Sequence, residues 1–172
     1  DDLIPFDQSM VKKPQISLFL KHIKAYELIS KSNNEYSIIF EDDVLLHRNF
    51  MIHLENGLKQ LPEDYDVLLI GEGTGDYHIP SSMLLANKLV YRKSLNPSQW
   101  GGNGATRGLD GYIISKKCAT IIENYFSTLG VDKVKLNIDW WLNEVFRKFN
   151  FNVYWIEPTI VATGSVLGIY KS

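Results

Sequence analysis

The sequence predicts one α/β domain in which a mixed sheet is flanked by helices, and three observations lead to this prediction. Short apolar segments typical of strands alternate along the chain with segments of helical periodicity. The composition, 45% hydrophobic and 22% charged over 172 residues, suits a globular domain with a sizeable core. No internal repeat, low-complexity linker or shift in composition marks a boundary. We therefore expect residues 1–172 to form a single domain.

The first half of the chain sets the pattern of elements. Apolar residues in ISLFLKHIKAYELIS, residues 16–30, fall on helical spacing and predict an amphipathic helix. The apolar run YSIIF, residues 36–40, is typical of a strand covered on both faces. A second helix is expected at 49–61, and a second buried strand at 65–71.

The second half continues this alternation after a different middle section. Residues 72–107 are rich in Gly and Pro and predict loops, interrupted by a strand at 87–93. The remaining elements are a strand at 110–115, helices at 116–126 and 139–149, and a strand at 151–157. Residues 159–172 lack helical periodicity and are expected to wrap back over the domain as an extended tail.

The composition also limits the partners of the protein. A formal net charge of −2 and scattered Lys and Arg residues give no basic surface for nucleic acid. No segment has the long apolar run of a membrane span, and DDLIPFD lacks the features of a signal peptide. The one cysteine, Cys118, excludes a disulfide framework and is expected to be a buried thiol. We therefore expect a soluble, cytoplasmic protein with no nucleic-acid partner and no membrane span.

Three consecutive carboxylates, Glu41, Asp42 and Asp43, directly follow the strand predicted at 36–40. Adjacent negative charges repel one another unless a cation compensates them. Because side chains alternate along a strand, Glu41 and Asp43 can share one side while Asp42 points to the other. Hard oxygen donors favour Mg²⁺ or Mn²⁺, which keep positions for water and substrate phosphates. The triplet therefore predicts a metal site, and a solvated turn that caps the next helix is the alternative.

Several motifs of the chain resemble glycosyltransferase family 25, which includes lipooligosaccharide and collagen galactosyltransferases. The helix segment SLFLKHIKAYELI and the strand with its triplet, YSIIFEDDVLLHRNF, are the most specific motifs. The segment TRGLDGYIISKKCATII is moderately specific. YDVLLIGEG, IDWWLNEVF and EPTIVATGSVLGIYKS also stand in the family's order, so the resemblance runs from about Ser17 to the C-terminus.

The resemblance implies a GT-A-like nucleotide-diphosphosugar transferase fold with a metal-binding, DXD-like motif. In this sequence Glu41, Asp42 and Asp43 stand at that motif and would hold Mn²⁺ or Mg²⁺ against a diphosphate. Family members are classed as inverting enzymes that commonly use UDP-sugars, which implies a UDP-hexose donor and a glycan or glycoprotein acceptor. The family's opening strand has no counterpart in DDLIPFDQSM, so we expect a domain without this strand.

An inverting transfer needs a base for the acceptor hydroxyl and stabilisation of the leaving diphosphate. Asp139 is the first candidate base, because Trp140 and Trp141 offer sugar-stacking faces and an apolar wall. A helix N-cap beside two core tryptophans is the alternative. Asp110 could accept hydrogen bonds from donor-sugar hydroxyls or form a simple turn. Arg107 could reach the diphosphate or lie at the surface.

The histidines are further candidates for ligand contacts. His22, on the first predicted helix, is expected near the triplet and could touch the ligand or be a satisfied helix residue. His47 and His53 are expected at the surface, and a metal role for His78 stays open. No histidine follows His78, so the tail would contribute hydroxyl or backbone groups, for example at Ser165, or leave those sites to water.

Other functions compete with sugar transfer. A phosphoacceptor receiver domain also places acidic residues after a strand, but YDVLLIGEG ends in Gly-Glu where that class needs Asp. A metal-dependent phosphohydrolase would share the carboxylates, although the wide loop at 72–107 favours a second substrate. The main alternative is a non-catalytic sugar- or partner-binding module that keeps the fold. The sequence therefore predicts a metal-dependent glycosyltransferase that moves a hexose from a UDP-sugar to a glycan or protein hydroxyl.

Overall fold

The computed structural model describes residues 11–72, 79–93, 107–129 and 135–170, and its main feature is a mixed five-stranded sheet in the order β1-β5-β3-β6-β4. The strands are β1 (Tyr36–Phe40), β3 (Val67–Leu69), β4 (Val90–Arg92), β5 (Gly111–Ser115) and β6 (Val153–Ile156). β3 and β6 are parallel, and the other three pairings are antiparallel. Consequently β1, β3 and β6 all finish at one end of the sheet, where β5 begins. We call this the site end, and the other the opposite end.

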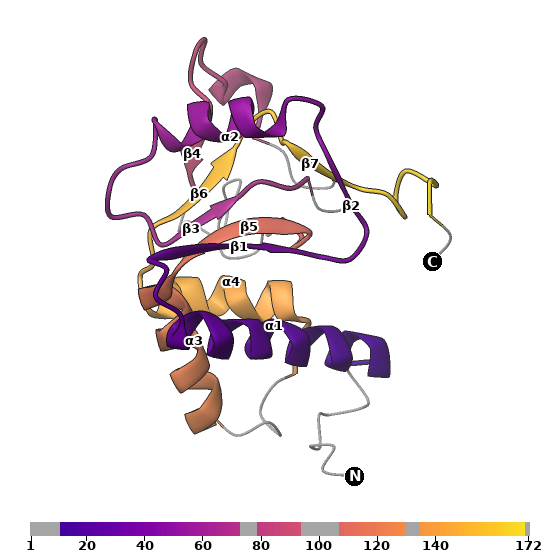
Figure 1. Ribbon diagram of the computed structural model, residues 1–172, viewed down its shortest axis with the longest axis vertical. Helices are drawn as coiled ribbons and strands as arrows, with labels where there is room; N and C mark the ends of the chain where they lie inside the picture. Colours follow the sequence, from indigo (N-terminus) through magenta and orange to yellow (C-terminus); the bar gives the residue numbers. More distant parts are fainter. Residues whose placement is uncertain (1–10, 73–78, 94–106, 130–134, 171–172) are drawn as a thin grey trace.

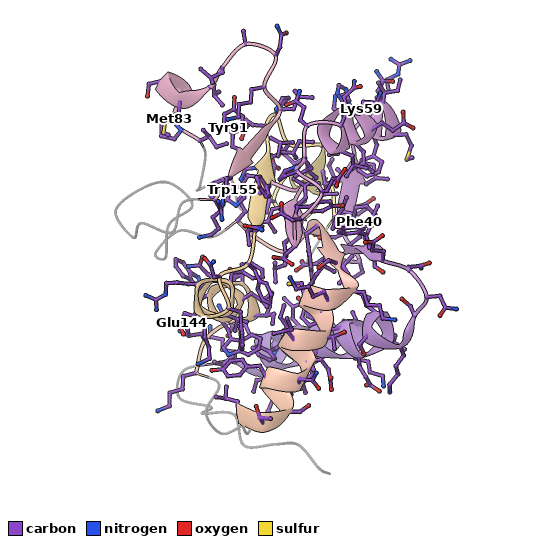
Figure 2. All side chains as sticks on the ribbon, turned by 90° about the vertical axis from the view of Figure 1, so that its left-hand side faces the viewer. Phe40, Lys59, Met83, Tyr91, Glu144 and Trp155 are labelled. Atoms are coloured by element: carbon purple, nitrogen blue, oxygen red, sulfur yellow. The ribbon has the colours of Figure 1, made fainter. Side chains whose placement is uncertain are left out.

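Helices cover both faces of the sheet (Figure 1). On one face lie α1 (Lys13–Lys31), α3 (Lys116–Leu129) and α4 (Ile138–Lys148), and on the other lies α2 (Phe50–Leu58). The central strand, β3, explains how one sheet supports two cores, because its side chains point alternately to the two faces of the sheet. Val67 and Leu69 belong to the core beneath α1, α3 and α4, whereas Leu68 belongs to the core beneath α2. The side view of Figure 2 labels Trp155 on β6, and this wholly buried residue belongs to the core beneath α1, α3 and α4.

The predicted helices are confirmed with small differences at their ends. The buried residues of α1 are Phe19, His22, Tyr26 and Ile29, whose spacing of three or four places them on one side of a helix. The helix begins before residue 16 because Pro14 is well accommodated in a first turn. The start of α3 is fixed by Ser115, whose hydroxyl accepts the Cys118 N–H at 3.1 Å.

The expectation that β1 is covered on both faces is wrong. β1 is one of the two edge strands of the sheet, and Ile38 and Phe40 are 43% and 39% exposed. Ile39, on the alternate face, packs against the core beneath α1. A continuous apolar run suits either position, because the position of a strand depends on which other strands pair with it.

A small second sheet was not predicted. β2 (Val44–Leu46) pairs antiparallel with β7 (Val161–Thr163), and a bridge between Gly71 and Val161 connects β7 to the end of β3. The prediction of a tail that wraps back over the domain is therefore confirmed for 161–163. This small sheet holds the residues after the acidic triplet against the C-terminal segment, by which we mean residues 161–170.

The other predicted strands at 65–71, 87–93, 110–115 and 151–157 are confirmed by β3, β4, β5 and β6. Of the predicted loop at 72–107, the structure describes residue 72, residues 79–93, which include a 3-10 turn at Ser81–Met83, and Arg107. Cys118 is buried as expected, and burial raises the pKa of its thiol. Among the described residues, no helix is both long and apolar enough to cross a bilayer.

Candidate active site

The site end brings together residues that are far apart in the sequence. Glu41 directly follows β1, and Asp110 directly precedes β5. Because these two strands are antiparallel neighbours, the Glu41 N–H donates to the Asp110 carbonyl at 3.0 Å. The sheet pairing thus fixes one residue of the acidic triplet beside Asp110.

A cavity of about 290 Å³ opens at this point, and we call it the carboxylate cavity. Three carboxylates line it: Glu41 after β1, Asp110 before β5 and Asp139 in the first turn of α4. The other lining residues are Gln15, Leu18, Gly108, Leu109, Asn137, Ile138, Thr163 and Val166. None of the described lining residues is Lys, Arg or His, so the cavity gathers negative charge without a basic side chain on its wall.

A second cavity of about 220 Å³ lies beside the first, between α1 and the end of β1. We call it the helix-side cavity. Its lining residues are Leu18, Lys21, His22, Ala25, Ile39, Phe40, Glu41 and Asp42. Glu41 and Leu18 line both cavities, so a ligand that occupied both would pass Glu41.

Asp110 is buried, and two residues that the sequence did not single out define its surroundings. The Thr163 hydroxyl donates to Asp110 Oδ2 at 3.2 Å. Gly71, at the end of β3, leaves room for the carboxylate, because a Cβ at this position would clash with it. The glycine that ends the strand was a visible signal for a close approach, whereas Thr163 is placed only by the pairing of β7 with β2.

Asp139 faces the carboxylate cavity and has a perturbed acidity. Burial raises the pKa of its carboxyl group, and the negative charge of Glu41 adds to this rise. The backbone N–H groups of Trp140 and of Asp139 itself oppose the shift. The N-cap of α4 is Asn137, so the alternative in which Asp139 caps the helix is wrong.

The expectation that the tryptophans beside Asp139 offer sugar-stacking faces is wrong for Trp141. Its side chain is buried, and its ring lies 5.1 Å from that of Phe19 and 6.2 Å from that of Phe126. It therefore packs in the core beneath α1 and α3. Trp140 is half-buried and lines neither of the two cavities.

The acidic triplet does not divide as strand alternation predicted. Glu41 lines both cavities and the exposed Asp42 lines the helix-side cavity, but Asp43 lines neither. Instead Asp43 Oδ2 accepts the Ser165 N–H at 3.1 Å, and its carbonyl accepts the Gly164 N–H at 2.9 Å. The β2–β7 pairing causes this difference by placing the C-terminal segment beside Asp43. The capping alternative is also wrong, because Asn49 precedes α2.

Arg107 is directed into the fold rather than toward either cavity. It is 1% exposed, its Nη1 donates to the Ile156 carbonyl at 2.8 Å, and its Nη2 pairs with the Glu157 carboxylate. The guanidinium also stacks over Trp155, and burial lowers its pKa. The surface position considered from sequence is therefore wrong. Arg107 is not among the lining residues of either cavity, although its charge acts on Asp110, and its contact with a diphosphate stays a prediction.

The structure confirms that α1 carries His22 close to the triplet. His22 is buried, with Nε2 3.8 Å from Glu41 Oε1 and Nδ1 2.8 Å from the Tyr112 hydroxyl. His47 is exposed and His53 half-buried, and their rings lie 4.6 Å apart. His78 lies outside the described residues.

The oxygen donors at the site end suit a divalent ion that a ligand helps to bind. In the described ranges, no three or more His, Cys, Asp or Glu side chains are placed to hold a metal by themselves. Glu41 and Asp42 are hard donors on the helix-side cavity, and Mg²⁺ and Mn²⁺ commonly combine one or two carboxylates with water and phosphate oxygens. The residues present therefore fit an ion that shares its coordination with a phosphorylated ligand.

Comparison with known proteins gives one clear result. The model of glycosyltransferase family 25 (LPS biosynthesis protein) matches residues 7–139. This range includes the triplet, Asp110 and Asp139, whereas β7 and the C-terminal segment lie beyond it. A search of curated proteins found no match. Since the matched range is well over half of the chain, the resemblance is confirmed, and the chain belongs to glycosyltransferase family 25, described as LPS biosynthesis protein.

Proposed function

We propose that this protein transfers a hexose from a UDP-sugar to a hydroxyl of a glycan or protein acceptor, with inversion, in the carboxylate cavity. One observation carries the proposal: Glu41, Asp110 and Asp139 come from three separate segments and line one cavity. Family membership implies sugar transfer and supports the assignment of a GT-A-type fold. The position of the cavity, beyond the carboxyl ends of β1 and β3, is the usual ligand position in open α/β sheets.

The donor would lie across both cavities. Two adjoining cavities suit a ligand with two parts, and Glu41 stands between them. We assign the nucleotide to the helix-side cavity and the sugar to the carboxylate cavity, so that the diphosphate passes Glu41 and Asp42. These two residues would hold Mn²⁺ or Mg²⁺, which as a Lewis acid stabilises the negative charge of a leaving diphosphate.

Asp139 is our candidate for the general base. Its raised pKa makes the deprotonated carboxylate a stronger base than an ordinary aspartate, and it faces the cavity in which the acceptor hydroxyl would lie. The carboxylate would take the proton of the acceptor hydroxyl as the oxygen attacks the anomeric carbon. Asp110, held by Thr163, is placed to accept hydrogen bonds from sugar hydroxyls. Asp43 would act indirectly, by holding the C-terminal segment beside the site.

The first test is calorimetric titration of UDP, UDP-glucose and UDP-galactose, with Mn²⁺ and then with a chelator. We expect binding that depends on the metal, and the comparison of the two sugars would identify the preferred donor. A transfer assay with the preferred donor then separates an enzyme from a binding module, because only the enzyme consumes the donor. Absence of binding in both conditions would contradict the proposal.

A further inference from the structure

A buried chain of hydrogen bonds leads from α1 through β5 back to His22, which faces Glu41. The hydroxyl groups of Tyr26 and Tyr112 lie 2.7 Å apart, and the Tyr112 hydroxyl lies 2.8 Å from His22 Nδ1. The other ring nitrogen of His22, Nε2, lies 3.8 Å from Glu41 Oε1. Tyr26, Tyr112 and His22 are 0%, 1% and 4% exposed, so bulk water offers no alternative partners inside this chain.

The protons available to this chain of hydrogen bonds can be counted. Burial raises the pKa of both tyrosines far above the physiological range, so each hydroxyl keeps its proton. A neutral imidazole has one N–H, on either Nδ1 or Nε2. The two contacts, Tyr26 with Tyr112 and Tyr112 with His22 Nδ1, therefore share two hydroxyl protons and, in one tautomer, a ring proton.

Only one arrangement gives both hydroxyl donors an acceptor within this chain of contacts. If Tyr26 donates to Tyr112 and Tyr112 donates to Nδ1, both hydroxyl protons are bonded and the ring proton lies on Nε2, toward Glu41. If Nδ1 carries the proton instead, it donates to the Tyr112 oxygen. The contact between the two tyrosines can then use only one hydroxyl proton, so the other has no acceptor among the described residues, and the Nε2 lone pair faces the Glu41 carboxylate. An unsatisfied buried donor and a repulsive contact both disfavour this second arrangement.

We propose that Tyr112, supported by Tyr26, is a positioning residue that fixes His22 as its Nε2–H tautomer with this N–H directed toward Glu41. The direct contact alone would fix the ring less firmly, because 3.8 Å is longer than a hydrogen bond. His22 and Glu41 both line the helix-side cavity, so the fixed N–H faces Glu41 and can donate to an oxygen of a ligand there. The consequence for donor binding rests on the proposed function, whereas the tautomer itself does not.

Nitrogen NMR of the protein with ¹⁵N-labelled histidine tests the tautomer directly. The His22 signals are identified among those of the four histidines because they disappear in His22→Gln. We expect His22 to show a protonated Nε2 and an unprotonated Nδ1. A protonated Nδ1 in the wild-type protein would overturn the proposal, whether or not any variant folds.

Two tyrosine variants form a matched pair, because each removes one buried hydroxyl from the same chain of contacts. Tyr112→Phe removes the donor to Nδ1, so we expect His22 to become a mixture of tautomers. Tyr26→Phe leaves the Tyr112 hydroxyl free to donate to Nδ1, so the single tautomer should persist. An unchanged His22 spectrum in a folded Tyr112→Phe protein would contradict the proposed role of Tyr112.

Donor binding provides the second measurement. In calorimetry with UDP and Mn²⁺, we expect Tyr112→Phe to weaken binding about tenfold, more than Tyr26→Phe does. Equal effects of the two variants would overturn the link between the tautomer and the site. If the wild-type protein shows the Nε2–H tautomer and yet binds no UDP, the proposed function fails while the positioning role stands.

Discussion

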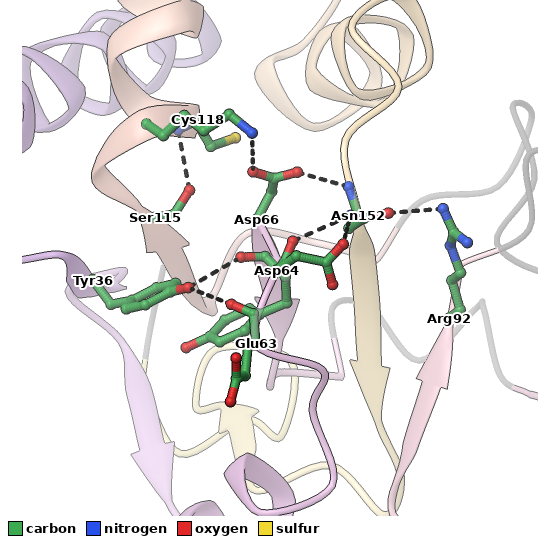
Figure 3. Close-up of polar contacts among 10 residues, drawn as sticks. Tyr36, Glu63, Asp64, Asp66, Arg92, Ser115, Cys118 and Asn152 are labelled. Atoms are coloured by element: carbon green, nitrogen blue, oxygen red, sulfur yellow. Dashed lines mark hydrogen bonds and ion pairs between the residues drawn. The ribbon is translucent and has the colours of Figure 1, made fainter.

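The carboxylates at the two ends of the sheet have different surroundings. At the opposite end, Asp66 is buried, accepts the Asn152 N–H at 2.9 Å and lies 3.8 Å from the Lys117 ammonium (Figure 3). The Asn152 side chain in turn donates to Asp64 and accepts from Arg92. At the site end, Glu41, Asp110 and Asp139 share a cavity without a basic residue on its described wall.

Charge balance, and not size, distinguishes the two ends. The opposite end also has a cavity, of about 460 Å³, which is larger than the carboxylate cavity. Its wall combines the acidic Glu35, Glu63, Asp64 and Asp66 with Lys116 and Lys117. Carboxylates near one another destabilise the folded protein unless positive charge or hydrogen-bond donors compensate them. At the opposite end two lysines on the cavity wall supply positive charge. At the site end the Thr163 hydroxyl and the charge of Arg107 act on Asp110, and a ligand with its cation could supply further compensation.

Removing the charge that both cavities share should have the largest effect. We expect Glu41→Gln to lower turnover about a thousandfold, because the cation that would stabilise the leaving diphosphate loses one of its two proposed carboxylate ligands. Glu35→Gln is the matched control, since Glu35 is an exposed glutamate just before β1, at the opposite end. Steady-state assays of both variants compare the two ends directly. Wild-type turnover in Glu41→Gln would remove the functional distinction between them.

Substitution of the candidate base, Asp139, should have the second-largest effect on turnover. We expect Asp139→Asn to lower kcat about a hundredfold or more, because the acceptor hydroxyl loses its proton acceptor. Donor affinity, measured by calorimetry, should persist, since the proposed donor contacts lie at Glu41, Asp42 and Asp110. Loss of donor binding together with turnover would assign Asp139 to a binding role instead.

The close approach of Gly71, just after β3, to the Asp110 carboxylate offers a test of the site geometry. A methyl group on residue 71 would displace the Asp110 carboxylate, so Gly71→Ala should cost about 1–3 kcal/mol of stability and also lower activity. Gly57→Ala is the control, because its new methyl group would clash with the end of the flexible Ile156 side chain and make only ordinary contact with Val90. Denaturant unfolding and assays of the folded protein separate the two effects. Unchanged stability and activity in Gly71→Ala would contradict the described packing.

Substitutions at the opposite end should have the smallest effect on activity. Asp66→Ala leaves the Asn152 N–H without its carboxylate partner, so we expect a loss of about 1–3 kcal/mol in the free energy of unfolding. Asp64→Ala, the same change at an exposed residue, should cost less. Turnover per folded molecule should stay at the wild-type level in both variants. A defect in turnover for folded Asp66→Ala would show that the two ends are coupled.

The sequence identified much of the fold and part of the site. Periodicity located the helices and the strands of the five-stranded sheet, because burial of one helix face or of a central strand requires a regular apolar pattern. The same reasoning failed at β1, whose apolar run does not show which strands flank it, and at β2, whose partner β7 lies far along the chain. It selected Glu41, Asp110 and Asp139 as separate candidates, and the structure places all three on one cavity.

By itself the sequence determined the local features of this protein: the amphipathic helices, the buried strands, the acidic triplet and the motifs of its family. Each depends on residues that are close together in the chain. Only the tertiary structure decided which carboxylates meet, because that depends on the antiparallel pairing of β1 with β5 and the position of α4. It also decided that Asp43 contacts the C-terminal segment and that Arg107 points inward. Contacts between distant segments are fixed by packing of the whole domain, and no local pattern records them.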